Sequence, residues 1–324
     1  MQTSPIPRRE RGATLLIILT IIGIGAAFLL VSALNKANQQ IERDKITAAA
    51  LAQAKDALIG RAALDDNRLG SLPCPDLVTN IAGINVPGDG TADLFAGNEC
   101  PSYVGWLPWR TLGLPELRDA SGERLWYALS RSLRDDGSAQ PINSSTAGDL
   151  AVGTTSQIAA IVFAPGQPLP GQSGRPSINV ADYLDGSNAD GDNIYTTGPL
   201  TNSFNDRLIH ISRDQLMTSV TKRVAQELKQ RLDAYGATYP PAGDPSGECQ
   251  AALTTGSIPL TDADLDCGGA LPVLPTWFQS NWFPVTTYTR DSTITTRATL
   301  NFNGCGITYI LNLGAPTTQN QPGC

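Results

Sequence analysis

The sequence contains an uncharged run of 22 residues near its N-terminus, Ala13-Thr-Leu-Leu-Ile-Ile-Leu-Thr-Ile-Ile-Gly-Ile-Gly-Ala-Ala-Phe-Leu-Leu-Val-Ser-Ala-Leu34. As an α-helix rising 1.5 Å per residue it reaches about 33 Å, which is enough to cross the hydrocarbon core of a bilayer. Three arginines, Arg8, Arg9 and Arg11, precede it. Because positive charge stays on the cytoplasmic side, we expect a cytoplasmic N-terminus and translocation of the chain after Lys36.

Two other export signals match part of this pattern. A cleaved signal peptide would use the small residues Val31-Ser32-Ala33, but the apolar run is longer than the roughly 7–15 residues of such a signal. Twin-arginine export fits less well, because Arg8-Arg9 is followed by Glu10-Arg11-Gly12 and not by apolar residues.

An amphipathic pattern continues the apolar run from Asn35 to Ala63. Apolar or long side chains recur there at intervals of three and four residues, which predicts a helix with one buried face. They are Ile41, Ala48, Leu51, Ala52, Lys55, Leu58, Ile59 and Ala62. Gly60, Gly70 and Pro73 are the expected stop signals. The two halves together predict one helix over 13–63, about 75 Å long.

The junction Arg11-Gly12-Ala13-Thr14-Leu15-Leu16 resembles the class III signal of type IV prepilins and type II secretion pseudopilins. In that family a membrane-embedded prepilin peptidase cuts after the glycine and methylates the new N-terminus. The resemblance therefore implies cleavage between Gly12 and Ala13, methylation of Ala13, and a single-pass inner-membrane protein with a periplasmic head. Its expected partners are the peptidase, the inner membrane and other pilin or pseudopilin subunits. A plain signal anchor that never enters a filament is the competing interpretation.

The sequence departs from the family pattern at Ile17. Pilins usually carry glutamate at this fifth position of the mature chain, where it pairs with the N-terminal amine of a neighbouring subunit. The subunit at the tip of the type II secretion pseudopilus also lacks that glutamate, so Ile17 favours a minor or tip subunit over a major one.

Composition excludes several classes of function. The chain has 324 residues with 30 acidic against 23 basic side chains, and a net charge of −7 argues against a nucleic-acid partner. The one histidine, His210, excludes zinc sites that need two imidazoles. Ser-His-Asp catalysis would have to use His210, yet no Gly-x-Ser-x-Gly motif occurs and Ser212 is expected to cap a helix. We therefore expect a protein that is not an enzyme.

All six cysteines lie beyond Gly70, in the part that we expect to be exported. An oxidising periplasm favours disulfides, and no C-x-x-C spacing indicates a metal. The candidates are Cys74, Cys100, Cys249, Cys267, Cys305 and Cys324. Six cysteines allow 15 pairings. We favour 74–100, 249–267 and 305–324, because each pair brackets a Gly/Pro-rich loop.

Two phrases in the first part of the head, 72–76 and 105–130, look like ones found in prepilin-like exported proteins of proteobacteria. Their aromatic residues allow a sugar- or peptide-binding platform or an aromatic core beneath proline-rich loops, and the core is favoured because loop-rich folds need large buried side chains. These residues are Trp106, Trp109, Trp126 and Tyr127.

An Asx-rich segment at 182–193 suggests calcium as the one possible cofactor, because hard cations prefer oxygen ligands. The candidate ligands are Asp185, Asn188, Asp190 and Asp192. The spacing is not that of an EF-hand, and Asx turns produce the same composition. A second such segment lies at 89–93.

The remaining patterns predict regular structure. Gln157–Ala164 indicates a buried strand, and Arg207–Ile211 a second strand. Ser212 with Gln215 forms a capping box for a helix that runs to Tyr235. Alternating Thr and apolar residues on both sides of Asn303-Gly304 predict a hairpin over 293–313.

These expectations combine into an α+β protein with a pilin-like long N-terminal helix. Its head is loop-rich and disulfide-stapled, with an antiparallel sheet and one further amphipathic helix. The expected parts are a leader over 1–12, the membrane and stalk helix over 13–63, and head subregions over 64–200 and 201–324. The expected function is a non-enzymatic minor pilin or pseudopilin that joins, primes or caps a type IV pilus or type II secretion filament. The alternative is a signal-anchored periplasmic binding or adhesin module.

Overall fold

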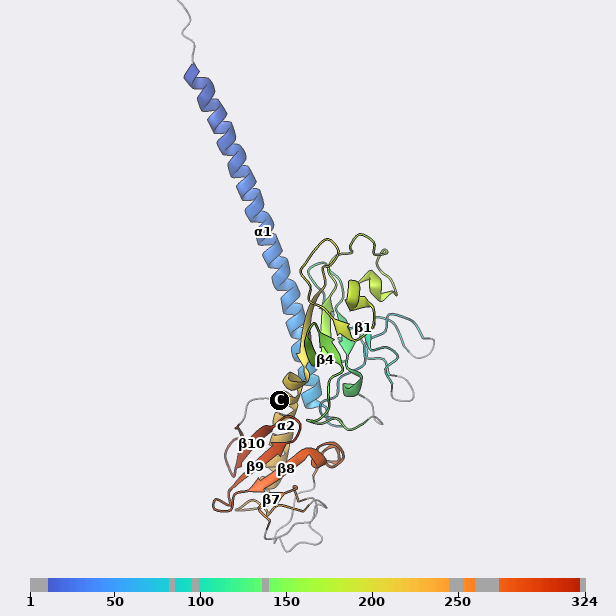
Figure 1. The fold of residues 1–324 in the computed structure, drawn as a ribbon, viewed down its shortest axis with the longest axis vertical. Coiled ribbons are helices and arrows are strands. Elements are labelled where there is room, and N and C mark those ends of the chain that lie inside the picture. The colour runs from blue at the N-terminus through green and yellow to red at the C-terminus, as the bar shows by residue number, and fades with distance from the viewer. Residues whose placement is uncertain are drawn as a thin grey trace, which may run out of the picture. The chain divides into compact units, whose positions relative to one another are not determined.

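The computed structural model describes residues 11–81, 85–94, 99–135, 140–244, 253–259 and 274–320, with side chains from residue 15 onward. The chain divides into two compact units, 1–48 and 49–324, and helix α1 (Arg11–Leu64) is shared between them. Figure 1 shows α1 as one continuous helix. It starts two residues before the predicted bound and ends one residue after it.

The end of α1 belongs to the second unit and presents one apolar face to the core of the head. Leu51, Leu58 and Ala62 are buried as the periodicity predicts, together with Ala54. Ile41, Ala48 and Ala52, which were expected on the same face, are exposed. The helix continues through Gly60 and ends at Leu64. The carboxylate of Asp65 then accepts hydrogen bonds from the backbone amides of Asn67 and Arg68, so the chain turns there and not at the glycine.

The first sheet of the head is built around β4 (Thr155–Ala164). β2 (Trp126–Leu129) and β6 (Arg207–Ser212) pair antiparallel with it, and β1 (Val104–Trp106) extends the sheet beyond β2. β3 (Leu150–Val152) pairs with the start of β4 and lies parallel to β5 (Ile194–Tyr195). Because β6 belongs to this sheet, the sheet takes strands from both sides of residue 200, the expected subregion boundary.

β4 has apolar neighbours on both faces, which explains its uninterrupted apolar sequence. Ala160 and Val162 pack in the main core with α1 and the second helix. Ile161 and Phe163 pack on the opposite face with Trp126 and Tyr183. The predicted buried strand is therefore confirmed.

Helix α2 (Arg213–Asp233) follows β6 directly and has the predicted capping box. The Ser212 hydroxyl accepts from the Gln215 amide at 3.1 Å, and the Gln215 side chain accepts from the Ser212 amide. Leu216, Val220 and Leu228 lie on the buried face.

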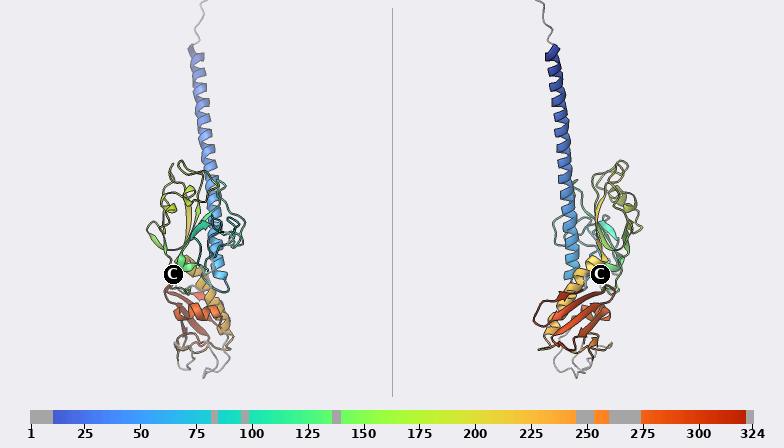
Figure 2. Two further views of the ribbon diagram at one scale, coloured as in Figure 1. Left: turned by 90° about the vertical axis from the view of Figure 1, so that its right-hand side faces the viewer. Right: turned by 60° about the vertical axis from the view of Figure 1, so that its left-hand side comes forward.

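The second sheet runs in the order β11-β10-β9-β8-β7 and is antiparallel throughout. Its strands are β7 (Thr255–Gly256), β8 (Thr286–Arg290), β9 (Arg297–Phe302), β10 (Ile307–Asn312) and β11 (Thr318–Gln319). The predicted hairpin is β9–β10, with a loop of four residues because Ile307 pairs with Phe302. The Thr221 hydroxyl of α2 lies 3.1 Å from the Tyr309 hydroxyl of β10, and Figure 2 shows α2 beside this sheet.

Short helical turns occupy several connections, which sequence patterns do not mark. They are Arg131–Leu133, Val180–Asp182, Gly186–Ala189, Phe278–Trp282 and Phe283–Val285. Helices α1 and α2 and the two sheets together confirm the predicted α+β class.

Candidate functional site

The apolar first part of α1 is the feature of the chain with the clearest chemistry. By length and composition this helix is able to cross a membrane. Its most apolar stretch of 18 residues has no side chain buried in the protein. Leu15, Phe28 and Leu34, for example, are 61%, 70% and 54% exposed. So much exposed apolar surface is stable in lipid or against other apolar helices, and a signal sequence has the same property.

The predicted processing site lies at the start of this helix. Gly12 and Ala13 are in the first turn of α1, which begins at Arg11. Ile17, four residues on from Ala13, is 58% exposed, so the fifth position counted from Ala13 carries an exposed apolar side chain.

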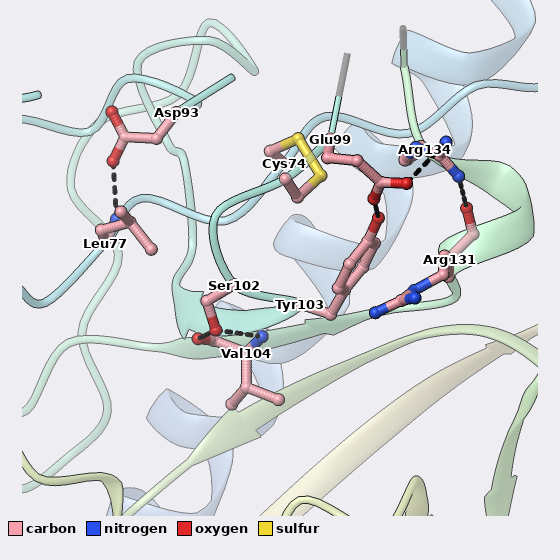
Figure 3. Close-up of a disulfide and its surroundings, with 10 residues drawn as sticks. Cys74, Leu77, Asp93, Glu99, Ser102, Tyr103, Val104, Arg131 and Arg134 are labelled. Carbon is pink, nitrogen blue, oxygen red and sulfur yellow. Dashed lines mark hydrogen bonds and ion pairs between the residues drawn. A yellow bond between two sulfur atoms is a disulfide. The ribbon is translucent and has the colours of Figure 1, made fainter. Parts of the chain in front are cut away.

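The predicted Cys74–Cys100 disulfide is present, with Cα atoms 5.5 Å apart and a sequence separation of 26. Both cysteines are buried. Next to it, Tyr103 donates to the Glu99 carboxylate, which also pairs with Arg134 at 3.2 Å, as Figure 3 shows. Burial and the bond to Glu99 raise the pKa of Tyr103 to about 12. This network holds the chain on both sides of Cys100.

Cys305 is also disulfide-bonded. Cys249, Cys267 and Cys324 lie outside the described residues, so the pairings 249–267 and 305–324 stay predictions.

The four candidate calcium ligands have hydrogen-bond partners within the chain. Asp185 accepts from the side chain of Gln172 at 2.9 Å and from the amide of Asn205 at 2.7 Å. The side-chain oxygen of Asn188 accepts from Thr196, while Asp190 and Asp192 accept from amides two residues further on. Across the described parts of the chain, no group of three or more His, Cys, Asp or Glu side chains is placed to hold a metal ion.

The second Asx-rich segment also forms loop hydrogen bonds. Asp76, which is almost fully buried, accepts from the amides of Gly88 and Gly90 at 2.9 and 2.8 Å. Asp93 accepts from the amide of Leu77 at 2.8 Å. Burial raises the pKa of Asp76 to about 6 despite these bonds, and Asp93 and Asp89 add to the rise. These carboxylates therefore fix the loop that precedes β1.

The tryptophan cluster is largely core. Trp126 and Tyr127 are fully buried. Trp106 packs edge-on against Trp126, with the Arg124 guanidinium 5.1 Å from its ring centroid. The gap beside Trp106 and Trp109 has a volume of about 10 Å³, which has room for about one water molecule. That volume is too small for a sugar ring.

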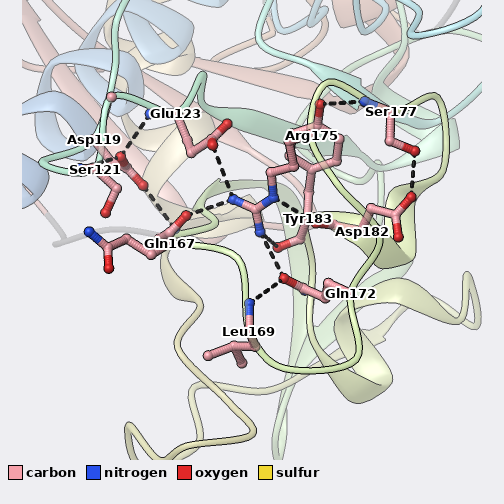
Figure 4. Close-up of polar contacts among 12 residues, drawn as sticks. Asp119, Ser121, Glu123, Gln167, Leu169, Gln172, Arg175, Ser177, Asp182 and Tyr183 are labelled. Atoms are coloured by element: carbon pink, nitrogen blue, oxygen red, sulfur yellow. Dashed lines mark hydrogen bonds and ion pairs between the residues drawn. The ribbon is translucent and has the colours of Figure 1, made fainter.

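Arg175 is the centre of a polar site in the head that no sequence pattern predicts. Its side chain is 5% exposed and donates to the carbonyls of Gly166 and Asp182, both at 2.7 Å. It also bonds Gln172 at 3.0 Å and pairs with Glu123 at 3.4 Å, with its guanidinium 4.7 Å from the Tyr183 ring centroid. Figure 4 shows these groups converging from separate loops.

A hollow of about 320 Å³ opens beside this site. It is lined by Leu169, Pro170, Gly171, Gln172, Ala181, Leu184, Asp185, Gly186, Ala189 and Ser203. The volume is at the lower end of the range for small-molecule pockets.

The surroundings of His210 indicate a structural role for this residue. Its carbonyl and the Gln215 side chain accept hydrogen bonds from the Lys55 ammonium at 3.0 and 2.9 Å. Burial lowers the pKa of the His210 imidazole, and the nearby Lys55 charge lowers it further. Ser212 is engaged in the α2 cap, so it does not form a nucleophile–base pair with this histidine.

No protein-family model, curated protein or solved structure matches this chain. The fold and the site together define an α+β protein with a long apolar N-terminal helix and at least one disulfide in its head.

Proposed function

We propose that this protein is a non-enzymatic minor pilin or pseudopilin subunit. It is held in the inner membrane by the first part of α1, carries its head in the periplasm, and joins or primes a type IV pilus or a type II secretion filament. The observation that carries the proposal is α1 itself, an unbroken helix of 54 residues. Its first part exposes apolar side chains, whereas one face of its last turns is buried in the head core.

That division suits a subunit that moves from lipid into a filament. Exposed leucines and isoleucines over 15–34 are equally well buried by lipid tails and by the helices of neighbouring subunits. The end of α1 stays packed in the head core during this transfer, because Leu51, Leu58 and Ala62 are buried there. Prepilin peptidase is the proposed processing partner, acting between Gly12 and Ala13.

The position in the filament follows from Ile17. Without a carboxylate at this site, the subunit has no group to neutralise the N-terminal amine of a subunit above it. We therefore place it among minor subunits, with the tip as the favoured position.

A signal-anchored binding or adhesin module is the second candidate function. It is favoured by the hollow of about 320 Å³ beside Arg175, which a purely structural subunit does not need.

Filament fractionation separates these functions. Filaments are sheared from cells that express the full chain, and head peptides are quantified by mass spectrometry in the filament and inner-membrane fractions, with and without the assembly ATPase of the system. The proposal expects head peptides in the filament fraction only when the ATPase is present. If the head stays entirely in the inner-membrane fraction, the adhesin alternative replaces the proposal.

A further inference from the structure

Asp206 is a buried carboxylate that no proposed activity uses. It lies just before β6 and is 3% exposed. One of its oxygens, Oδ2, accepts from the amide of Asp185 at 2.7 Å and from the side chain of Asn188 at 3.0 Å. The other, Oδ1, is buried and has no hydrogen-bond partner within the described residues. An ionised carboxylate with an unpartnered buried oxygen is costly, and protonation of that oxygen removes the charge.

Asp206 and Asp185 join two loop segments through reciprocal bonds. The amide of Asp206 donates to Oδ2 of Asp185 at 3.2 Å, while the amide of Asp185 donates to Asp206. A third segment is attached through Gln172, whose side-chain amide donates to Oδ1 of Asp185. The connection therefore holds together the segments 166–175, 182–188 and 203–206. Residues from each of them, among them Gln172, Asp185 and Ser203, line the hollow.

Two charged groups act on Asp206. Asp185 disfavours its ionised form, whereas Arg175 favours it. Arg175 is already engaged with Glu123 and with carbonyl oxygens, so it does not supply a donor to Oδ1. Burial is the largest effect, and the pKa of Asp206 rises to about 7.

We propose that Asp206 is a proton-operated clasp, which holds the segment 166–206 closed around the hollow when neutral and loosens it when ionised. The clasp is independent of whether the chain enters a filament, so it can fail or succeed separately from the proposed function. It makes the opening of this segment sensitive to pH between about 4 and 7.

The sign follows from proton binding. The closed segment retains the Asp206 proton up to about pH 7, whereas an opened, hydrated segment releases it near the ordinary value of about 4. Opening between these limits releases one proton. The opening equilibrium constant therefore rises by up to about tenfold per pH unit and levels off above about pH 7.

Hydrogen exchange tests the clasp on the full chain in detergent micelles, from about pH 4.5 to about pH 8 with labelling times scaled to the intrinsic exchange rate. Amides of 182–206 are expected to lose protection as pH rises, with the predicted plateau. Asp206→Asn should remove this pH dependence. Asp190→Asn, an exposed aspartate in the same segment, should retain it. A flat wild-type profile, or an unchanged slope in Asp206→Asn, overturns the proposal.

Carboxyl-carbon NMR of the unsubstituted chain, labelled on aspartate, gives a second readout that does not depend on folding of a variant. One aspartate carboxyl is expected to titrate close to pH 7. Asp76 is expected near pH 6, so the proposal is wrong if no aspartate titrates above about pH 6.

Discussion

Ile17 is the residue on which the proposed filament position depends. It lies near the start of the uncharged run and is exposed on α1. In a tip subunit no partner amine lies above it, so a carboxylate there would stay unpaired in apolar surroundings.

Ile17→Glu is expected to impair insertion or assembly, because an unpaired acid in the membrane costs about 2–4 kcal/mol on insertion scales. Filament incorporation is measured by head-peptide counts. The matched control is Ile41→Glu, which lies on the same helix beyond the uncharged run, is 52% exposed, and should be tolerated. If Ile17→Glu leaves incorporation unchanged or improves it, an internal minor position replaces the tip.

Gly304 is needed in the β9–β10 loop for two reasons. Its φ is +87°, and a Cβ there would lie 2.8 Å from the carbonyl oxygen of Ser144. Gly306 has a similar φ of +69° but open space around it. Gly304→Ala should therefore lower the free energy of unfolding by at least about 1 kcal/mol more than Gly306→Ala. Equal losses in urea denaturation would show that the close approach to Ser144 has no energetic effect.

At the scale of elements, the sequence predicts what short-range patterns encode. The Ser212–Gln215 box and the hairpin around Asn303-Gly304 depend on residues close in sequence, and both are present. The stalk helix was predicted within two residues at each end because its periodicity is long.

Contacts between distant segments were missed. β6 joins β4 across more than 40 residues, and no pattern in either strand specifies that partner. The contacts of Arg175 were not predicted either, because Glu123, Gly166 and Asp182 come together only in the folded head. Asp206 resembles an ordinary turn residue in sequence, and only burial gives it its chemistry.

Leu58 tests the attachment of α1 to the head. It is fully buried, so Leu58→Ala should lower the free energy of unfolding by about 2–5 kcal/mol through lost apolar contacts and a cavity. Leu64→Ala on the same helix is the control, since Leu64 is 69% exposed and its truncation should cost less than about 0.5 kcal/mol. Tryptophan fluorescence in urea follows both variants. If Leu58→Ala lowers the free energy of unfolding as little as Leu64→Ala does, the face of α1 that carries Leu58 does not stabilise the head.

The Cys74–Cys100 bond stabilises a loop region with little regular structure. Replacing both cysteines by serine should lower the free energy of unfolding by about 2–5 kcal/mol. Non-reducing peptide mapping of periplasm-derived protein is expected to find the 74–100 bond and no free thiol. Two or more free cysteines would contradict the view of a head stapled by three disulfides.

At the scale of the whole molecule, an apolar helix continues into a head that is folded around the end of that helix. The sequence predicted both parts, because hydropathy and helical periodicity are properties of the chain itself. It could not identify the filament system or a cargo, since those depend on the partner surfaces of other proteins. The hollow beside Arg175 was likewise invisible, because its lining comes from residues between 169 and 203.

The N-terminus of the mature chain shows whether a prepilin peptidase processes this protein between Gly12 and Ala13. Intact-mass and N-terminal peptide mass spectrometry are performed on the chain expressed with a prepilin peptidase, with a peptidase-deficient strain as the control. We expect loss of residues 1–12 and one methyl group on Ala13, only when the peptidase is present. An intact Met1, or a chain that begins at Leu34, would contradict the account.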